Sequence, residues 1–427
     1  MLSQAENKLL TRVGPGTAMG NLLRRFWQPF ALTSELPEPD SDPIRVRLLG
    51  EDLVAFRDSN GEVGLLAANC PHRGASLFFG RNEEAGLRCV YHGWKFSRDG
   101  ICRDMPNEPA ESDFRSRVRA VSYPVEAHGD VLWAYLGPET AEERPNPPAL
   151  EWTHVPASHR LVTKRIQVCN FLQNVEGEVD SSHVSFLHSK SPTAASAGVE
   201  DLRSTLPDYM ARDKAPRFFV LPTEYGLAIG ARRDAESDSY YWRITQFLMP
   251  SYTMIPVPVG FPVSFTGATP IDDEHMMGFT VTWHPDRPLT AGERAQIQAW
   301  TGVHTEVDPK TFRPLRNKDN EYLLDRELQR SGRSYTGIRG IREEDLAVQE
   351  GMGPIFDRTT EHLGTSDLAV IAMRRRLLEA VTALAEDGEV PYEARNADAY
   401  RVRSAALVLP RTVEWNEGAA EVLVARV

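Results

Sequence analysis

The chain has 427 residues, 41% hydrophobic and 9% aromatic, which is enough apolar material for two or three domains at roughly 150 residues each. Its net charge of −12 argues against non-specific binding to nucleic acid or anionic lipid. The sequence has no apolar run long enough for a membrane span and no secretion signal at its start. We therefore expect a cytoplasmic protein whose four cysteines are thiols or metal ligands rather than disulfides.

The first third of the chain predicts a small all-β domain. A helix-rich segment is expected over residues 4–28, within an N-terminal region (1–39) that packs on the later domain. Short strands separated by Gly and Asn turns follow, with almost no helical period, and predict a β-domain over 40–140. The Pro- and Glu-rich stretch after it predicts a linker over 141–160.

The rest of the chain, 161–427, mixes strand and helix patterns. Helix is expected over 171–188, antiparallel strands between 217 and 284, and helices over 344–359 and 367–387. Strands followed by covering helices predict an α+β domain.

Two short stretches each place a cysteine near a histidine. Cys70 and His72 lie in one, and Cys89 and His92 lie in the other. Ordinary buried cysteines and histidines would rarely be spaced in this way. Two interpretations remain, a Cys₂His₂ zinc site and a [2Fe–2S] cluster. Zinc fingers usually take both cysteines from one element and both histidines from another. Here each loop supplies one cysteine and one histidine. This arrangement favours a [2Fe–2S] cluster, with the cysteines on one iron and the histidines on the other.

The glycines of these loops and a nearby proline-rich stretch fit the same interpretation. Gly74 and Gly93 allow the backbone to fold tightly around sulfide ions. The stretch "DMPNEP" at 104–109 could shield such a cluster from water.

A second group of possible ligands lies at 180–188. Asp180 and His183 are three residues apart and His188 is five further on, so one bent helical segment could present all three. Two histidines and a carboxylate with open positions form the ligand set of non-haem Fe(II) oxygenases. Histidines near a helix end are more often caps or core residues, but the nearby acidic run and the first cluster favour a metal site here.

These motifs resemble those of a known family. The pattern CPH-x₁₆-CVYHGW is closely similar to the Rieske cluster motif, and Asp-x-x-His-x₄-His resembles the iron motif of Rieske non-haem iron oxygenases. The resemblance runs nearly end to end, through "VGPGTAMGNLLRRFWQPF" and "SGRSYTGIRGIREEDLAVQEGMGPIFDRTTEHLGTSDLAVI", and is to the phthalate dioxygenase branch. It implies a Rieske β-domain followed by a helix-grip catalytic domain, in which an antiparallel sheet curves around a helix.

The resemblance also implies roles for the second group. By it, His183 and His188 bind a mononuclear Fe(II), whereas Asp180 bridges an iron-ligating histidine and a cluster histidine of the neighbouring subunit. A third ligand comes from a late helix. We expect Asp345, at the opening of that helix, with the nearby acids as alternatives: Glu344, Glu350 and Asp357.

The implied activity is that of an oxygenase component. It would use O₂ and electrons from a separate NAD(P)H-dependent reductase, carrying flavin and [2Fe–2S], to dihydroxylate an aromatic carboxylate, in a homotrimer or stacked hexamer. Monooxygenation or O-demethylation of an aromatic acid stays open, as does a Rieske electron-transfer protein without the second iron. Arg243, on a largely apolar strand, is a candidate to bind the carboxylate, and Arg203 is a weaker one.

Overall fold

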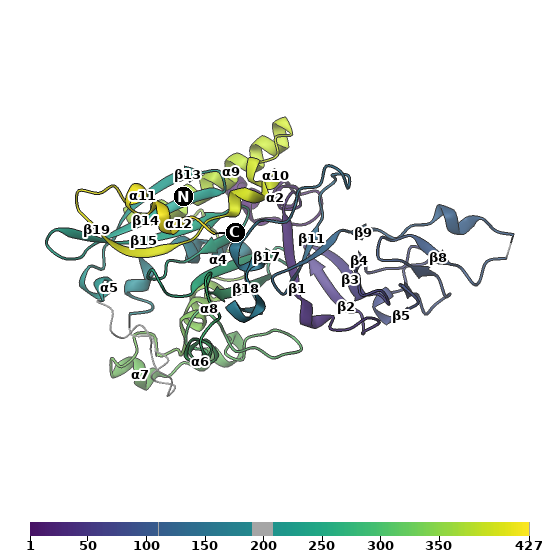
Figure 1. Ribbon diagram of the computed structural model, residues 1–427, viewed down its shortest axis with the longest axis horizontal. Helices are drawn as coiled ribbons and strands as arrows, with labels where there is room; N and C mark the ends of the chain where they lie inside the picture. Colours follow the sequence, from purple (N-terminus) through teal and green to yellow (C-terminus); the bar gives the residue numbers. More distant parts are fainter. Residues whose placement is uncertain (110, 190–207, 427) are drawn as a thin grey trace.

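The computed structural model describes residues 1–109, 111–189 and 208–426. Figure 1 shows an elongated molecule with small sheets at one end and a large sheet covered by helices at the other; both termini lie on the larger part. Within the described residues, no helix combines the length and the apolar character needed to cross a lipid bilayer.

The smaller part contains two four-stranded antiparallel sheets. The first has the order β2-β3-β4-β9 and the second the order β5-β6-β7-β8. Their strands are β2 (Ile44–Leu48), β3 (Glu51–Arg57), β4 (Val63–Ala67), β5 (Arg81–Glu83), β6 (Gly86–Arg88), β7 (Lys95–Phe96), β8 (Cys102–Asp104) and β9 (Ser122–Tyr123). Apolar side chains of both sheets form one cluster that also encloses Cys70 and Cys89, so the metal-binding loops are anchored in a core.

A three-stranded sheet, β1-β11-β10, lies between the two parts. Its strands are β1 (Trp27–Leu32), β10 (Val125–His128) and β11 (Val131–Tyr135). The N-terminal region was expected to be helical up to residue 28, but its second helix ends at Leu23 and Trp27 already pairs with Tyr135. Residues 27–31 are buried, and Pro29 lies among them; proline disrupts a helix interior but is tolerated in an edge strand, the position that β1 has beside β11.

The larger part is built on one antiparallel sheet with the order β12-β18-β17-β16-β15-β14-β13, and β19 also pairs with β15. Its strands are β12 (Arg160–Gln167), β13 (Arg217–Thr223), β14 (Gly226–Asp234), β15 (Ser239–Leu248), β16 (Tyr252–Met254), β17 (Val263–Pro270), β18 (Met276–Trp283) and β19 (Ala405–Pro410). Helix α4 (Phe171–Val179) packs against β15, β16 and β17. This is the α+β architecture expected from the sequence.

Helices surround this sheet. The α-helices besides α4 are α1 (Gln4–Thr11), α2 (Ala18–Leu23), α3 (Glu151–His154), α5 (Tyr209–Arg212), α6 (Ala291–Gln298), α7 (Arg326–Arg330), α8 (Ile341–Gly351), α9 (Leu368–Asp387), α10 (Tyr392–Arg395), α11 (Trp415–Gly418) and α12 (Ala420–Leu423). Helices α1 and α2 pack against α9, and α8 packs against α4.

The helix expected over 344–359 is shorter and begins earlier. It starts at Ile341 and ends at Gly351 because Gly353 has φ +91° and Pro354 cannot continue a helix. Asp345 therefore lies in the second turn of α8 and not at its opening.

A buried ion pair links the N-terminal region to the large sheet. The Lys164 ammonium on β12 lies 2.8 Å from both carboxylate oxygens of Glu35, and the two side chains are 7% and 13% exposed. Removing one member of such a pair leaves an uncompensated charge, which is costlier than removing both.

We expect Lys164→Met to lower the free energy of unfolding by about 3 kcal/mol, and the Lys164→Met/Glu35→Gln double variant to lose less. Denaturant-induced unfolding followed by circular dichroism measures both. Lys310→Met, at an exposed position, is the control and should unfold like the parent. A double variant less stable than Lys164→Met would contradict the pairing argument.

Candidate metal centres

The two cysteine-containing loops close in the same way. The Cys70 N–H donates to the Ala75 carbonyl (2.8 Å) and the Gly74 N–H donates back to Cys70 (2.9 Å). In the second loop, the N–H of Cys89 donates to Trp94 (2.8 Å) and that of Gly93 to Cys89 (3.0 Å). Both glycines have positive φ, +73° and +78°, which explains why glycine is needed in each turn.

The two histidines of these loops lie side by side. Their ring centroids are 4.5 Å apart, and the His72 ring also stacks on the Trp94 indole at 4.1 Å. The Trp94 indole N–H donates to Asn107, and Pro106 packs so closely on Gly93 that an added Cβ would lie 2.6 Å from its ring. The 104–109 stretch therefore covers this loop, as the sequence indicated.

The side chains of both loops fit a [2Fe–2S] cluster. Cys70 and Cys89 are buried free thiols, and burial beside Cys89 raises the pKa of Cys70 to about 11. The His92 Nδ1 atom is buried without a hydrogen-bond partner. Bound iron would convert the thiols to thiolates and give this imidazole nitrogen the partner that it otherwise lacks.

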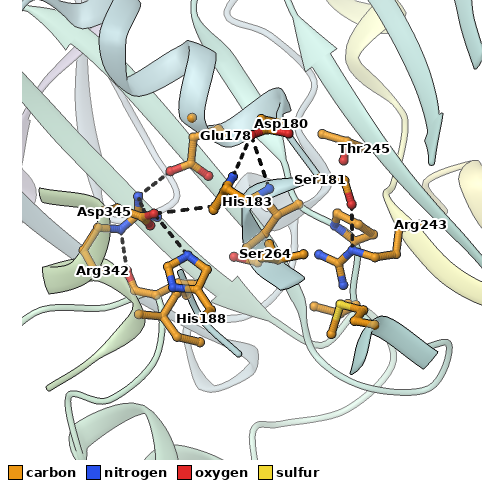
Figure 2. A pocket seen from close by; sticks show the side chains of 18 of the residues that line it. Glu178, Asp180, Ser181, His183, His188, Arg243, Thr245, Ser264, Arg342 and Asp345 are labelled. Carbon is orange, nitrogen blue, oxygen red and sulfur yellow. Dashed lines mark hydrogen bonds and ion pairs between the residues drawn. The ribbon is translucent and has the colours of Figure 1, made fainter. Parts of the chain in front are cut away.

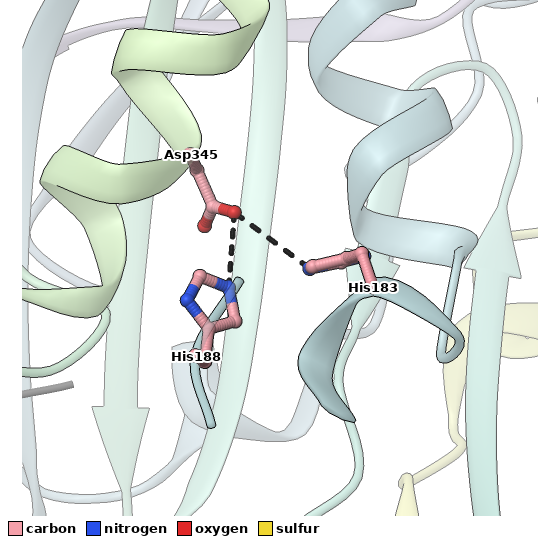
Figure 3. Close-up of side chains that lie close together, drawn as sticks. All are labelled: His183, His188 and Asp345. Atoms are coloured by element: carbon pink, nitrogen blue, oxygen red, sulfur yellow. Dashed lines mark hydrogen bonds and ion pairs between the residues drawn. The ribbon is translucent and has the colours of Figure 1, made fainter. Parts of the chain in front are cut away.

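The second group of possible ligands comes from two segments that are distant in the sequence. His183 and His188 lie in the turns that follow α4, and Asp345 lies in helix α8. His188 Nε2 lies 3.1 Å and His183 Nε2 lies 3.7 Å from the same oxygen, Oδ1 of Asp345 (Figure 3). One ligand atom from each of the three side chains lies within 4.8 Å of the other two. This is the set of two histidines and a carboxylate expected for mononuclear Fe(II).

The segment 180–188 is not one helix, contrary to expectation. Helix α4 ends at Val179, Asp180 is extended, and a short 3₁₀ turn begins at His183. The Asp180 carboxylate stops the helix because it accepts the backbone N–H of Ser182 (2.6 Å) and of His183 (3.3 Å). The resulting bend lets His183 and His188 face each other, with ring centroids 5.0 Å apart.

A carboxylate also lies behind each histidine. Asp180 Oδ2 is 3.2 Å from His183 Nδ1, and Glu344 Oε2 is 2.7 Å from His188 Nδ1. When each Nδ1–H donates to its carboxylate, the lone pair of Nε2 is free for a metal. Glu344, considered above as an alternative ligand, thus lies on the far side of His188.

The other two alternative acids lie elsewhere in the hydrogen-bond network. Glu350 accepts the Val168 N–H (3.0 Å) and the Tyr322 hydroxyl, whereas Asp357 accepts from Thr359. Of the four acids considered from the sequence, Asp345 is the one grouped with both histidines.

The charges of this site favour a cation. Burial opposes a charge on His188, but the carboxylates of Asp345 and Glu344 raise its pKa to about 9. Burial alone would raise the pKa of Asp345, yet His188, Arg342 and His183 hold it at about 2. A divalent ion between these groups would take the place of the proton.

The metal-binding group borders a cavity of about 240 Å³ (Figure 2). Apolar side chains form much of its wall, among them Val184, Met210, Ile255, Val257, Val303 and Ile341. Arg243 also lines it, and its Nε–H donates to the Ser181 hydroxyl at 3.2 Å. Arg203, the weaker carboxylate-binding candidate, lies outside the described residues.

A second arginine in the wall, Arg342, was not expected from the sequence; its guanidinium lies beside Glu178 and Asp345. The sequence did contain one indication of this contact. Arg342 lies three residues before Asp345, and this spacing places both side chains on one face of a helix.

Comparison with known proteins agrees with both centres. A model of the Rieske [2Fe–2S] domain matches residues 26–124, and a model described as LigXa C-terminal domain like matches 134–426. The 3-chlorobenzoate-3,4-dioxygenase oxygenase subunit of Comamonas testosteroni is 38% identical over 96% of both chains. The phthalate 4,5-dioxygenase oxygenase subunit of Pseudomonas putida is 39% identical over 98% of this chain and 94% of its own.

The same architecture occurs in solved structures. NdmB of Pseudomonas putida CBB5 superposes with a TM-score of 0.57 at 21% identity, over 90% of this chain and 97% of that one. The chain belongs to the Rieske non-haem iron oxygenases, a family that carries a Rieske [2Fe–2S] cluster and uses mononuclear iron at the catalytic site. Both named relatives are oxygenase subunits, and a solved structure with the same fold, the oxygenase of carbazole 1,9a-dioxygenase, is in complex with a ferredoxin; it superposes with a TM-score of 0.56 at 18% identity, over 91% of this chain and 98% of that one.

If His183 is an iron ligand, His183→Ala should lose the mononuclear iron and keep the visible absorption of the cluster, because the cluster loops lie in another domain. Iron analysis should give three irons per chain for the parent and two for the variant, and the visible spectrum reports the cluster. His362→Ala, at an exposed position, is the control. Loss of the cluster band in His183→Ala would mean that the two centres are wrongly assigned.

Proposed function

We propose that this chain is the oxygenase component of a system that dihydroxylates an aromatic carboxylate, using O₂ and electrons from a separate NAD(P)H-dependent reductase. The relatives named for chlorobenzoate and phthalate support this substrate class. The main observation in support is that Arg243 lines the cavity near the metal ligands and has no acidic partner among the described residues.

Arg243 differs in this respect from the other arginine of the cavity. Arg342 is neutralised by Glu178 and lies beside Asp345, whereas Arg243 donates to a neutral hydroxyl, that of Ser181. A half-buried guanidinium without a carboxylate partner has unused donors in a fixed fork, which match both oxygens of a carboxylate. The negative net charge of the chain gives no long-range attraction for an anion, so recognition has to be local.

The dimensions and lining of the cavity suit one substituted ring. An apolar cavity of about 150 Å³ holds benzene, and this one measures about 240 Å³. A ring held against Ile255 and Val257 with its carboxylate on Arg243 would lie between that arginine and the metal ligands, since all of them line the same space (Figure 2).

The metal-binding residues take the following roles in this proposal. Cys70, Cys89, His72 and His92 hold the [2Fe–2S] cluster; His183, His188 and Asp345 hold the iron. When bound, the cluster supplies electrons and the iron supplies the centre at which O₂ is activated. Asp180 fixes the tautomer of His183 by accepting from its Nδ1–H, and its half-buried carboxylate is available to a second imidazole.

That second imidazole would come from a neighbouring subunit. The strands β5 and β8, next to the cluster loops, lie at the end of the molecule remote from α4 and α8 (Figure 1). Tyr91 and Val90 beside His92 are 55% and 57% exposed, an apolar tip suited to contact with another chain. These features support a head-to-tail homotrimer, or a stacked hexamer, in which His72 or His92 reaches Asp180 of the next protomer.

The test of this function is product identification with a panel of benzoate derivatives and a borrowed reductase. We expect a cis-dihydrodiol from at least one carboxylated ring, and Arg243→Gln to lower kcat/KM for it roughly 10- to 100-fold, since a charged hydrogen bond contributes about 1.5–3 kcal/mol. The methyl ester of the same acid should be affected little.

Arg232→Gln is the matched control for Arg243→Gln. It removes the same charge from the neighbouring strand, and Arg232 pairs with Trp242, so its side chain lies on the opposite face of the sheet from Arg243. Equal losses for the acid and its ester in Arg243→Gln would contradict carboxylate recognition. A singly hydroxylated or demethylated product would place the chain with the monooxygenases or demethylases instead.

We expect Asp180→Asn to retain both metals and to lose most of its turnover, because only the connection between the two centres is changed. Iron content and cluster absorption report the metals, and single-turnover product formation with a pre-reduced cluster reports the connection. Asp357→Asn, an exposed hydrogen-bonded acid remote from the histidines, should behave as the parent. Normal coupled turnover by Asp180→Asn would refute the bridging role.

A further inference from the structure

The two oxygens of Asp345 have different surroundings. Oδ1 faces both histidines, at 3.1 Å from His188 Nε2 and 3.7 Å from His183 Nε2. Oδ2 faces the other way and lies 3.5 Å from Nη1 of Arg342 (Figure 2). One oxygen is thus directed to the position of a metal and the other to a guanidinium.

Arg342 is held firmly in this place. Its side chain is 1% exposed, its Nε–H donates to the Val303 carbonyl at 3.1 Å, and its Nη2 lies 3.5 Å from the Thr266 hydroxyl. The Nη1 group is shared between Glu178 and Asp345. A guanidinium with contacts on all of its nitrogens cannot turn away from Asp345 without breaking several of them.

The positive charge behind Asp345 is reinforced by a second buried guanidinium. Arg165, on β12, has no ion pair with a carboxylate among the described residues, and it occupies space left by Gly278, where an added Cβ would lie 2.4 Å from its Cζ. Burial and the neighbouring charge of Arg342 lower the pKa of Arg165 to about 9. The back of the metal site therefore carries two cations against the carboxylates of Glu178 and Asp345.

We propose that Arg342 is a positioning residue that keeps Oδ2 of Asp345 away from the metal, so that Asp345 binds through Oδ1 alone. A carboxylate can bind a metal with one oxygen or with two, and two would occupy a further coordination position. Arg342 would leave that position unoccupied by the protein. This inference rests on the proposed assignment of His183, His188 and Asp345 as metal ligands.

Glu178 sets how strongly Arg342 acts. It neutralises the guanidinium and is the nearer of the two carboxylates that share Nη1, so it competes with Asp345 for that group. Without its charge, Arg342 would be drawn more closely to Oδ2 and would repel a bound cation more strongly. Loss of Arg342 and loss of the Glu178 charge should therefore change metal affinity in opposite directions, whereas damage to the fold would lower it in both variants.

The test uses the full chain with its cluster intact and Co²⁺ in place of the mononuclear iron. X-ray absorption at the cobalt edge reports the coordination number of that metal alone, and competition with a chelator gives its affinity. We expect Arg342→Met to gain one oxygen neighbour, with a weaker pre-edge peak, and to bind Co²⁺ roughly tenfold more tightly. Arg342→Lys keeps a cation beside Oδ2 and should retain the coordination number of the parent.

Two further variants complete the test. Glu178→Gln, which keeps the size of the side chain, should bind Co²⁺ several-fold more weakly than the parent. Arg339→Met removes an equal charge from an exposed position just before α8 and should change neither measurement. The visible absorption of the cluster and the thermal unfolding midpoint identify any variant that fails to fold.

The inference is overturned if a folded Arg342→Met keeps the coordination number of the parent, or if Arg342→Met and Glu178→Gln both weaken cobalt binding. The proposed metal assignment fails separately, if His183→Ala binds cobalt as the parent does. If His183→Ala loses cobalt and Arg342→Met keeps the coordination number of the parent, the proposed metal ligands stand and only the role of Arg342 is refuted.

Discussion

The catalytic part of this protein depends on a buried carboxylate that faces two imidazoles. Asp345 is 9% exposed, and an isolated carboxylate at such a depth would be strongly unfavourable. It is compensated on both sides: the two imidazoles, with any metal between them, face Oδ1, and the Arg342 guanidinium faces Oδ2. The packing of α8 on α4 is what brings these groups together.

The same requirement for charge compensation separates the residues that build the site from Arg243, the residue proposed to bind a substrate carboxylate. Arg342 and Glu178 neutralise each other in the wall of the cavity. Asp180 and Glu344 are each engaged by a histidine. Of the two arginines that line the cavity, Arg243 is the one without an acidic partner among the described residues, and under the proposed function an anionic substrate would complete its surroundings. In this interpretation, specificity for a carboxylate comes from the one guanidinium of the cavity wall, Arg243, that the fold does not pair with an acid among the described residues.

The two metal centres are built by different means. The cysteine loops close on themselves by backbone hydrogen bonds over four and five residues, and a small core of their own domain anchors them. The mononuclear site instead combines a helix end, a 3₁₀ turn and the middle of a distant helix. The first centre is thus a local structure, whereas the second exists only when the large sheet and its helices have assembled.

This difference explains what the sequence by itself determined. It predicted the α+β class, and it singled out the four residues proposed to hold the cluster and the two histidines proposed to hold the iron, because local spacing and strand or helix period carry that information. It favoured Asp345 as the third ligand through the family resemblance but left Glu344, Glu350 and Asp357 as alternatives, since which acid faces the histidines depends on how α8 packs on α4. It also missed strand β1, which its pairing with β11 stabilises, and the contact of Arg342 with Asp345. Only the tertiary structure decided these points, because each depends on which side chains from distant segments share one buried space.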